Sequence, residues 1–171
     1  MLKNATEYRE ELQEQYERIK YDDKYKFYFA NSYRSDNFDL RTELDKDCIE
    51  QVSVNQDNIV IGYMLAKVEK DWNVVIDLRI LNFKQKDNIT FAKDLFIFLQ
   101  NLFVVEGFRK LQFKCIVGNP IEKMYIKYIQ RYGGNIVGVF HNSVKLIDGK
   151  IYDYTLYEVF KEDFDRIIKK K

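Results

Sequence analysis

The residues that could carry out chemistry in this chain are few, and they lie far apart in the sequence. His141 is the only histidine, and no serine or cysteine motif accompanies it. A hydrolytic triad needs a nucleophile, a base and an orienting acid, so the sequence argues against that class of enzyme. Cys48 and Cys115 do not have the spacing of metal ligands or of a redox pair. The sequence therefore predicts no metal site.

One stretch does suit a ligand, and the ligand that it suits is an anion. Val74–Leu81 is typical of a strand, and an amphipathic helical pattern starts near Ile89. The N–H groups at the start of a helix have no partner within it, and the helix dipole is positive there. Lys84 and Lys86 in the connecting loop would attract a phosphate, whereas Asp87 would repel one. The order of strand, loop and helix start therefore predicts a site for an anionic cofactor.

Length and composition limit the class of protein. A chain of 171 residues fits one domain with a substantial core. The 28 basic and 27 acidic residues leave a net charge of +1, which argues against binding to nucleic acid. No stretch approaches the roughly 18 consecutive apolar residues of a membrane span. Because the two cysteines are separate and no secretory segment is evident, we expect a cytoplasmic protein without a membrane partner.

The N-terminal quarter of the chain is predicted to be helical. Asn4 or Thr6 can cap a first helix that runs to about Ile19. Asp22–Arg34 is predicted as a second, aromatic helix, although its aromatic residues alternate enough to permit a strand. Asn31–Asp47 includes loop.

The remainder of the chain alternates between strands and helices, with turn residues between them. Its first three strands follow one another across short polar turns, so they should form an antiparallel meander. The resulting fold class is α/β, a single domain with a mixed, mostly antiparallel twisted sheet flanked by helices. Strands are expected at Ile49–Val54, Ile59–Val68, Val74–Leu81, Leu111–Val117, Asn135–Phe140 and Ile151–Val159, and helices at Ile89–Val105, Ile121–Tyr132 and Asp163–Lys170.

Several short motifs occur at the order and spacing of a known family. Between residues 49 and 165 the chain resembles the GNAT superfamily of acyl-CoA-dependent N-acyltransferases, particularly its ribosomal-protein-acetyltransferase-like branch. The resemblance rests on Ile61–Leu65, Ile76–Leu81, Glu106–Leu111, Asn119, Tyr132–Gly134 and Asp148–Tyr154.

The resemblance implies where acetyl-CoA would bind. In this family the central strand and its neighbour splay apart, and the pantetheine arm lies in the opening against strand backbone groups. The pyrophosphate lies over the loop that begins the long helix. The implied contacts are Leu78, Arg79, Ile80 and Leu81 for the arm, and Lys84, Lys86, Asn88, Ile89, Thr90 and Ala92 for the pyrophosphate.

The loop before the long helix departs from the family's pattern, which is Arg/Gln-x-x-Gly-x-Gly/Ala. Counting forward from the central strand places Thr90 and Ala92 at the two small positions. Counting backward from Gly107 places Ile89 and Phe91 there instead. Neither register contains a glycine, which would let the backbone approach the pyrophosphate closely. The loop therefore either binds acyl-CoA in an altered way or has lost the cofactor.

The resemblance also implies a reaction, the transfer of an acetyl group from acetyl-CoA to a primary amine by direct attack in a ternary complex. Asp77 is at the position of an acidic base, or is an outward-facing strand residue that pairs with a lysine. Counting back from Gly133 favours Tyr128 as the acid for the thiolate, with Tyr125 as the second choice. Asn119 would bind the cofactor arm or cap the following helix.

The implied acceptor is an amine, either a small molecule or a protein N-terminus or lysine. Residues 1–48 would form the acceptor side and residues 49–165 the core, and a homodimer would be ordinary for this family. The alternative function is a non-catalytic protein of the same fold that binds a partner or a small ligand.

Overall fold

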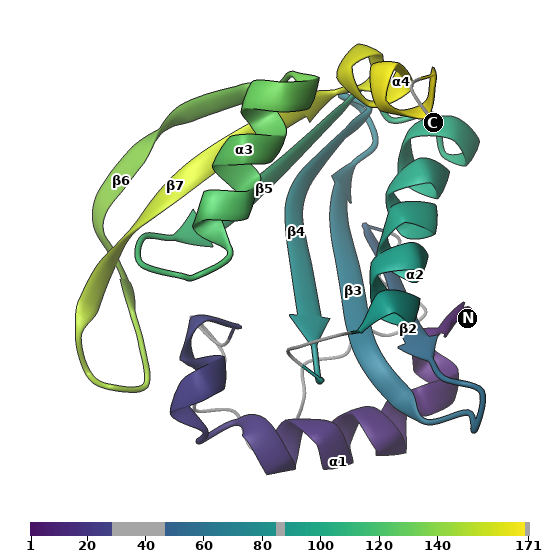
Figure 1. Ribbon diagram of the computed structural model, residues 1–171, viewed down its shortest axis with the longest axis vertical. Helices are drawn as coiled ribbons and strands as arrows, with labels where there is room; N and C mark the ends of the chain where they lie inside the picture. Colours follow the sequence, from purple (N-terminus) through teal and green to yellow (C-terminus); the bar gives the residue numbers. More distant parts are fainter. Residues whose placement is uncertain (29–46, 85–87, 170–171) are drawn as a thin grey trace.

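The computed structural model describes residues 1–28, 47–84 and 88–169 and contains one seven-stranded sheet (Figure 1). The strand order is β1-β2-β3-β4-β5-β7-β6, and only β4 and β5 run parallel to each other. This arrangement confirms the predicted α/β fold with a mostly antiparallel sheet. The strands are β1 (Leu2–Asn4), β2 (Cys48–Val54), β3 (Val60–Glu69), β4 (Val74–Asn82), β5 (Lys110–Ile116), β6 (Asn135–Lys145) and β7 (Ile151–Phe160).

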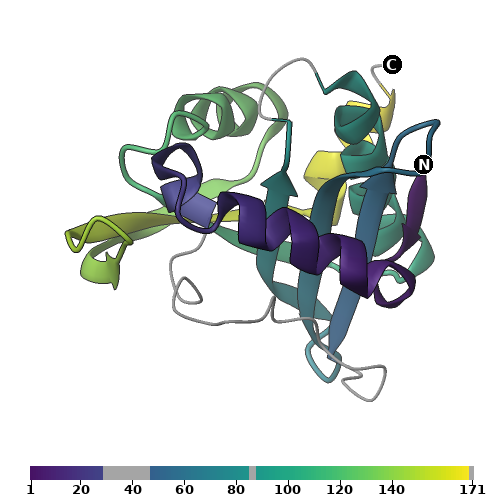
Figure 2. The same ribbon diagram turned by 90° about the horizontal axis from the view of Figure 1, so that it is seen from below.

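Helices cover both faces of the sheet. Those on the first face follow the central strands in the chain, whereas those on the second belong to the N-terminal segment, and α1 crosses the strands there (Figure 2). The first face carries α2 (Ile89–Gln100), the π-helical turn η3 (Asn101–Val105), α3 (Glu122–Tyr132) and α4 (Lys161–Lys169), and the second carries the 3₁₀ helices η1 (Ala5–Tyr8) and η2 (Asp23–Tyr28) and α1 (Arg9–Ile19).

Two apolar clusters hold these layers together, and the alternation of β3 divides its residues between them. Met64 and Ala66 belong to the cluster under α2, α3 and α4. Tyr63 and Leu65 belong to the cluster under α1. Because successive strand side chains point to opposite faces, a strand that is buried on both faces is almost continuously apolar, as β3 is.

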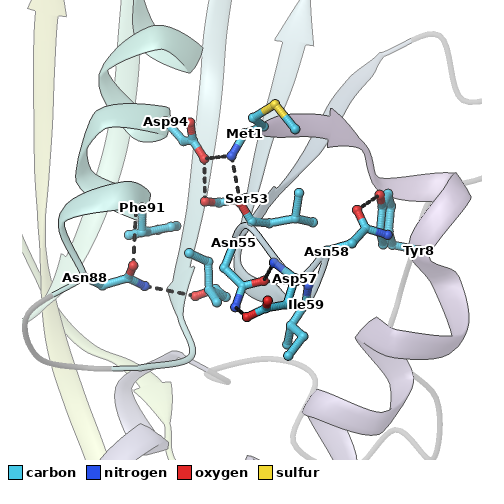
Figure 3. Close-up of polar contacts among 12 residues, drawn as sticks. Met1, Tyr8, Ser53, Asn55, Asp57, Asn58, Ile59, Asn88, Phe91 and Asp94 are labelled. Atoms are coloured by element: carbon cyan, nitrogen blue, oxygen red, sulfur yellow. Dashed lines mark hydrogen bonds and ion pairs between the residues drawn. The ribbon is translucent and has the colours of Figure 1, made fainter.

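Polar contacts fix the first meander turn and the position of α2 (Figure 3). Asn55 Oδ1 accepts from the backbone N–H groups of Asp57 and Ile59, at 3.0 and 2.8 Å. On α2, Asp94 is buried, and its Oδ2 accepts from the Ser53 hydroxyl at 2.6 Å. The Met1 amino group lies 2.9 Å from the same carboxylate oxygen.

The antiparallel pairing of β2 with β3 and of β3 with β4 confirms the predicted meander.

The structure adds one strand to the predicted elements and changes the extent or type of three others. Strand β1 was not predicted because three residues show no periodicity. The long helix changes at Asn101 into a π turn, in which the Glu106 N–H donates to the Asn101 carbonyl at 2.9 Å. Strand β6 extends beyond Phe140 to Lys145 through a bulge. The predicted helix over 22–34 is a 3₁₀ helix at Asp23–Tyr28, and residues 29–34 lie outside the described residues.

Within the described ranges no helix is long and apolar enough to cross a membrane. No group of three or more His, Cys, Asp or Glu side chains in the same ranges is arranged to hold a metal ion.

Candidate functional site

The candidate site is the opening between β4 and β5, which follows directly from their pairing. The parallel ladder contains only the pairs Val74↔Lys110 and Val75↔Leu111. Beyond them β4 stays paired with β3 as far as Asn82, and β5 stays paired with β7. The two strands therefore diverge toward their C-terminal ends (Figure 1). Alternate N–H and C=O groups of β4 face this opening, where no described strand pairs with them.

The predicted arm-binding residues lie along the diverging part of β4, and their side chains are engaged elsewhere. Leu78 is buried in the cluster under α2 and α3, and Ile80 packs against it. Leu81 is buried in the cluster under α1. Arg79 is half-exposed and lies beside Asp77. This part of β4 can therefore contact a ligand in the opening through its backbone N–H and C=O groups.

Asn88 builds the start of α2 and attaches it to the sheet (Figure 3). Its Oδ1 accepts from the Phe91 N–H at 3.2 Å, which is an ordinary N-cap contact. Its Nδ2 donates to the Ile61 carbonyl at 3.2 Å and to Asn82 Oδ1 at 2.8 Å. The helix start is thus held at the end of β4, beside the mouth of the opening. Among the lysines predicted for the loop, Lys84 is exposed, and Lys86 lies outside the described residues.

The side chains in the first turn of α2 bear on the two ways of counting along the loop. Phe91 is buried, and its ring covers Gly62 so closely that a Cβ there would lie 2.1 Å from it. Thr90 and Ala92, on either side of Phe91, are exposed. Ile89 is also exposed, at 69%. Since Phe91 faces the sheet, the geometry favours the register in which Thr90 and Ala92 stand at the family's two small positions.

Asn119 lies at the other rim of the opening, between β5 and α3. Its N–H donates to the Ile116 carbonyl at 3.0 Å, and its Oδ1 accepts from the Ile121 N–H at 3.2 Å. The capping interpretation therefore accounts for the carbonyl end of this side chain. Within the described part of the chain, the amide nitrogen is the end that remains for a ligand.

The two candidate tyrosines of α3 have different neighbours. The Tyr125 ring lies 5.0 Å from that of Phe113 on β5 and 6.0 Å from that of Tyr157 on β7. Tyr128 instead pairs with Tyr132, at 4.9 Å between ring centroids. Burial raises the pKa of Tyr125, and it raises that of Tyr128 to about 12. Both phenols therefore keep their protons at neutral pH, and Tyr125 is the one that borders β5.

Asp77 lies on β4 two residues beyond the last pair with β5. It pairs in register with Lys67, but its nearest charged contact is Arg79, with 4.0 Å between Asp77 Oδ2 and Arg79 Nε. The Asp77 side chain is 26% exposed. Because Leu78 points toward α2 and α3, its neighbour Asp77 points toward the α1 side. Asp77 and Tyr125 therefore belong to opposite faces of the sheet, on either side of the opening.

The resemblance implied that the aromatic N-terminal segment lies on the acceptor side, and the contacts of η2 show which part of the sheet it meets. In η2, the Tyr25 hydroxyl donates to the Phe83 carbonyl, directly after β4, at 2.9 Å. Burial raises the pKa of Tyr28, with smaller effects from nearby Tyr25 and Cys115. Cys115 on β5 is buried, which raises its pKa to about 12. This 3₁₀ helix therefore lies on the α1 side of the sheet, against the end of β4.

Comparison with solved structures places the fold among acetyltransferases. The spermidine/spermine N-acetyltransferase SpeG from Vibrio cholerae, solved with manganese ions, superposes with a TM-score of 0.60 at 15% identity, over 75% of this chain and 72% of that one. A candidate acetyltransferase gives a TM-score of 0.59 at 19% identity, over 74% and 68% of the two chains. Another, from T. thermophilus, gives 0.58 at 19% identity, over 74% and 65%.

The sequence matches no protein-family model and no curated protein sequence. The structural similarities show the fold and do not single out the ribosomal-protein branch. What they support is the architecture, so the chain has a GNAT-like fold in which β4 and β5 part at the position that the resemblance implied.

Proposed function

We propose that this protein is an N-acetyltransferase that transfers an acetyl group from acetyl-CoA to a primary amine. The observation that carries the proposal is the parting of β4 and β5, with the start of α2 held at its mouth by Asn88. Acetyltransferases with this architecture, among them the spermidine/spermine enzyme, give the proposal its reaction class.

The residues around the opening fit acetyl-CoA. The backbone of Leu78–Leu81 offers peptide groups to the pantetheine arm, and the Asn119 amide offers a donor on the opposite rim. Lys84 and the N–H groups in the first turn of α2 suit the pyrophosphate. Phe91 is turned into the core, and the small side chains Thr90 and Ala92 are exposed in that turn together with Ile89.

The chemistry requires two proton transfers around one bond exchange. The amine nitrogen attacks the thioester carbonyl carbon, the C–S bond breaks, and the sulfur leaves as a thiolate. Asp77 accepts the proton that the amine loses, directly or through water, and a tyrosine of α3 donates one to the thiolate. We assign that role to Tyr125 rather than Tyr128, because Tyr125 borders β5 whereas Tyr128 packs on Tyr132.

Binding of acetyl-CoA is the first test, and titration calorimetry measures it directly. We expect one site with micromolar affinity. Asn119→Ser keeps an oxygen that can cap α3 but removes the amide, so it should weaken binding about tenfold with little change in thermal stability. Asn135→Ala, which removes an exposed amide at the start of β6, is the matched control and should bind normally.

A second function has an observation in its favour, the absence of glycine between Lys84 and Phe91. Under this alternative the protein binds a partner or small ligand without catalysis. Failure to bind acetyl-CoA at millimolar concentration would support the alternative and contradict the transferase.

The acceptor class remains a primary amine of a small molecule, a protein N-terminus or a lysine. The proposal includes a cytoplasmic location and a homodimer. It includes no nucleic-acid or membrane partner. Mass spectrometry of products from an amine panel, with acetyl-CoA as donor, would identify the acceptor.

A further inference from the structure

Helix η2 is attached to both sides of the opening. On one side, Tyr25 donates to the Phe83 carbonyl at the end of β4. On the other side, Lys26 Nζ lies 3.0 Å from Asp148 Oδ2 and donates to the Tyr152 hydroxyl at 3.2 Å. Asp148 and Tyr152 belong to the hairpin of β6 and β7, which is separated from η2 by more than a hundred residues of chain. A six-residue helix thus links the two groups of strands that border the opening.

The contact among Lys26, Asp148 and Tyr152, here termed the Lys26 clamp, is more than a single surface ion pair. The Tyr152 hydroxyl donates to Asp148 Oδ2 at 2.6 Å, and the Lys150 N–H donates to Asp148 Oδ1 at 3.0 Å. The Lys26 and Asp148 side chains are only 24% and 20% exposed. The Phe27 ring packs edge-on against Tyr152, with the centroids 6.1 Å apart. The clamp therefore combines charge, hydrogen bonds and aromatic packing.

The clamp determines where Tyr28 lies. Tyr28 is two residues beyond Lys26, and its ring is 5.8 Å from that of Tyr25. Tyr28 is partly buried against the cluster under α1, and its phenol interacts electrostatically with Cys115 on β5 and with Tyr125 on α3. Since Tyr25 and Lys26 hold the helix from opposite sides, they fix the backbone from which the Tyr28 ring extends.

We propose that the Lys26 clamp holds Tyr28 as the wall that limits the width of the amine acceptor, so that Lys26 is a positioning residue and Tyr28 determines specificity. This inference rests on the proposed transferase function for its acceptor, but the clamp itself is a property of the fold. Opening the clamp exposes the site to wider amines and exposes the thiol of Cys115.

The native cysteines provide a readout that does not depend on activity. Cys115 is buried, whereas Cys48 is half-exposed and serves as the internal reference. Maleimide labelling, quantified for each cysteine by peptide mass spectrometry, reports how often the region around Cys115 opens. We expect Lys26→Ala and Tyr28→Ala to label Cys115 about tenfold faster than the native protein does, with Cys48 unchanged.

Two further variants separate the clamp from general destabilisation. Lys150→Ala removes a neighbouring lysine whose side chain takes no part in the clamp, so Cys115 labelling should stay at the native rate. Exchanging the two charges, with Lys26→Asp and Asp148→Lys in one chain, should restore much of the protection that either substitution alone removes. If Cys115 in Lys26→Ala is labelled no faster than in the native protein, the proposal is overturned.

Acceptor kinetics complete the test. Lys26→Ala should raise the KM for a slender alkylamine about fivefold with kcat nearly unchanged, and should improve kcat/KM for a branched or aromatic amine. An unchanged preference for acceptor width, despite faster Cys115 labelling, would overturn the role of Tyr28. If the native protein binds no acetyl-CoA, the transferase function and the acceptor role both fail, whereas Cys115 labelling still decides the clamp.

Discussion

At the scale of single residues, the assignment of the acid depends on which tyrosine of α3 faces the opening. Tyr125→Phe keeps the ring that packs on Phe113 and Tyr157 but removes the hydroxyl, so kcat should fall about 100-fold with the fold intact. Tyr128→Phe is the matched control and should retain kcat within about twofold, since its ring faces Tyr132. Steady-state rates at saturating acetyl-CoA measure both. If Tyr128→Phe instead lowers kcat more than Tyr125→Phe does, then Tyr128 is the acid, as counting from Gly133 favours.

Residue roles were harder to predict than residue types. The sequence supplied both tyrosines, but the connection from Asn119 to Gly133 allowed either of them to face the site. The choice depends on how α3 rotates against β5, and a packed ring such as that of Phe113 determines that rotation. The loop register was open for the same reason, because only the burial of Phe91 over Gly62 distinguishes the two ways of counting.

At the scale of elements, the hairpin of β6 and β7 should contribute stability in a pH-dependent manner. Bonds from Tyr152, the Lys150 N–H and Lys26 lower the pKa of Asp148 to about 2, from an ordinary value of 3.8. A carboxyl with a lowered pKa in the folded state stabilises the fold above its ordinary pKa and loses this effect as the pH falls toward its folded pKa.

Thermal unfolding across pH measures this contribution. Asp148→Asn should lower the melting temperature at pH 7 by a small amount, on the order of 2 °C, because partly exposed ion pairs stabilise little. The difference from the native protein should shrink between about pH 4 and pH 2. Asp71→Asn removes an exposed carboxylate in the turn before β4, so it is the matched control and should leave the melting temperature at pH 7 unchanged. A difference that persists at pH 2 would contradict the assignment.

Long, strongly periodic elements were predictable from the sequence, and short or irregular ones were not. Strand β6 was predicted only as far as Phe140 because its second half is polar and passes through a bulge. There Asn142 has a φ of 50°, and its N–H donates to Asp153 on the neighbouring strand at 2.8 Å. That bulge depends on a partner strand, so no local pattern could indicate it.

At the scale of the whole molecule, the sheet order was accessible only through the resemblance, and the contact between η2 and the β6–β7 hairpin was not accessible at all. The sequence does not encode in any local pattern that β5 pairs with β7 or that Lys26 meets Asp148. Both depend on contacts between distant parts of the chain, which composition and periodicity do not report.

The same sheet order leaves β6 at an edge, and this has a consequence for assembly. The outer N–H and C=O groups of β6 pair with no described strand. The strand also carries four apolar side chains that are 44 to 50% exposed, namely Ile136, Val137, Val139 and Phe140. Exposed apolar edge strands are templates for pairing with another chain. We therefore expect the 20.7 kDa chain to form a dimer through β6 at micromolar concentration.

Light scattering after size-exclusion chromatography measures the mass of the assembly. A lysine at the edge opposes strand pairing, so Val139→Lys should shift the protein to the monomer without loss of acetyl-CoA binding. Val105→Lys makes the same change at a 73% exposed position after α2 and should leave the dimer intact. Because the opening between β4 and β5 lies within one chain, the monomer should keep its catalytic rate. If the native protein is monomeric at every concentration, the predicted dimer through β6 is wrong. If the Val139→Lys monomer has no activity, assembly contributes to the site.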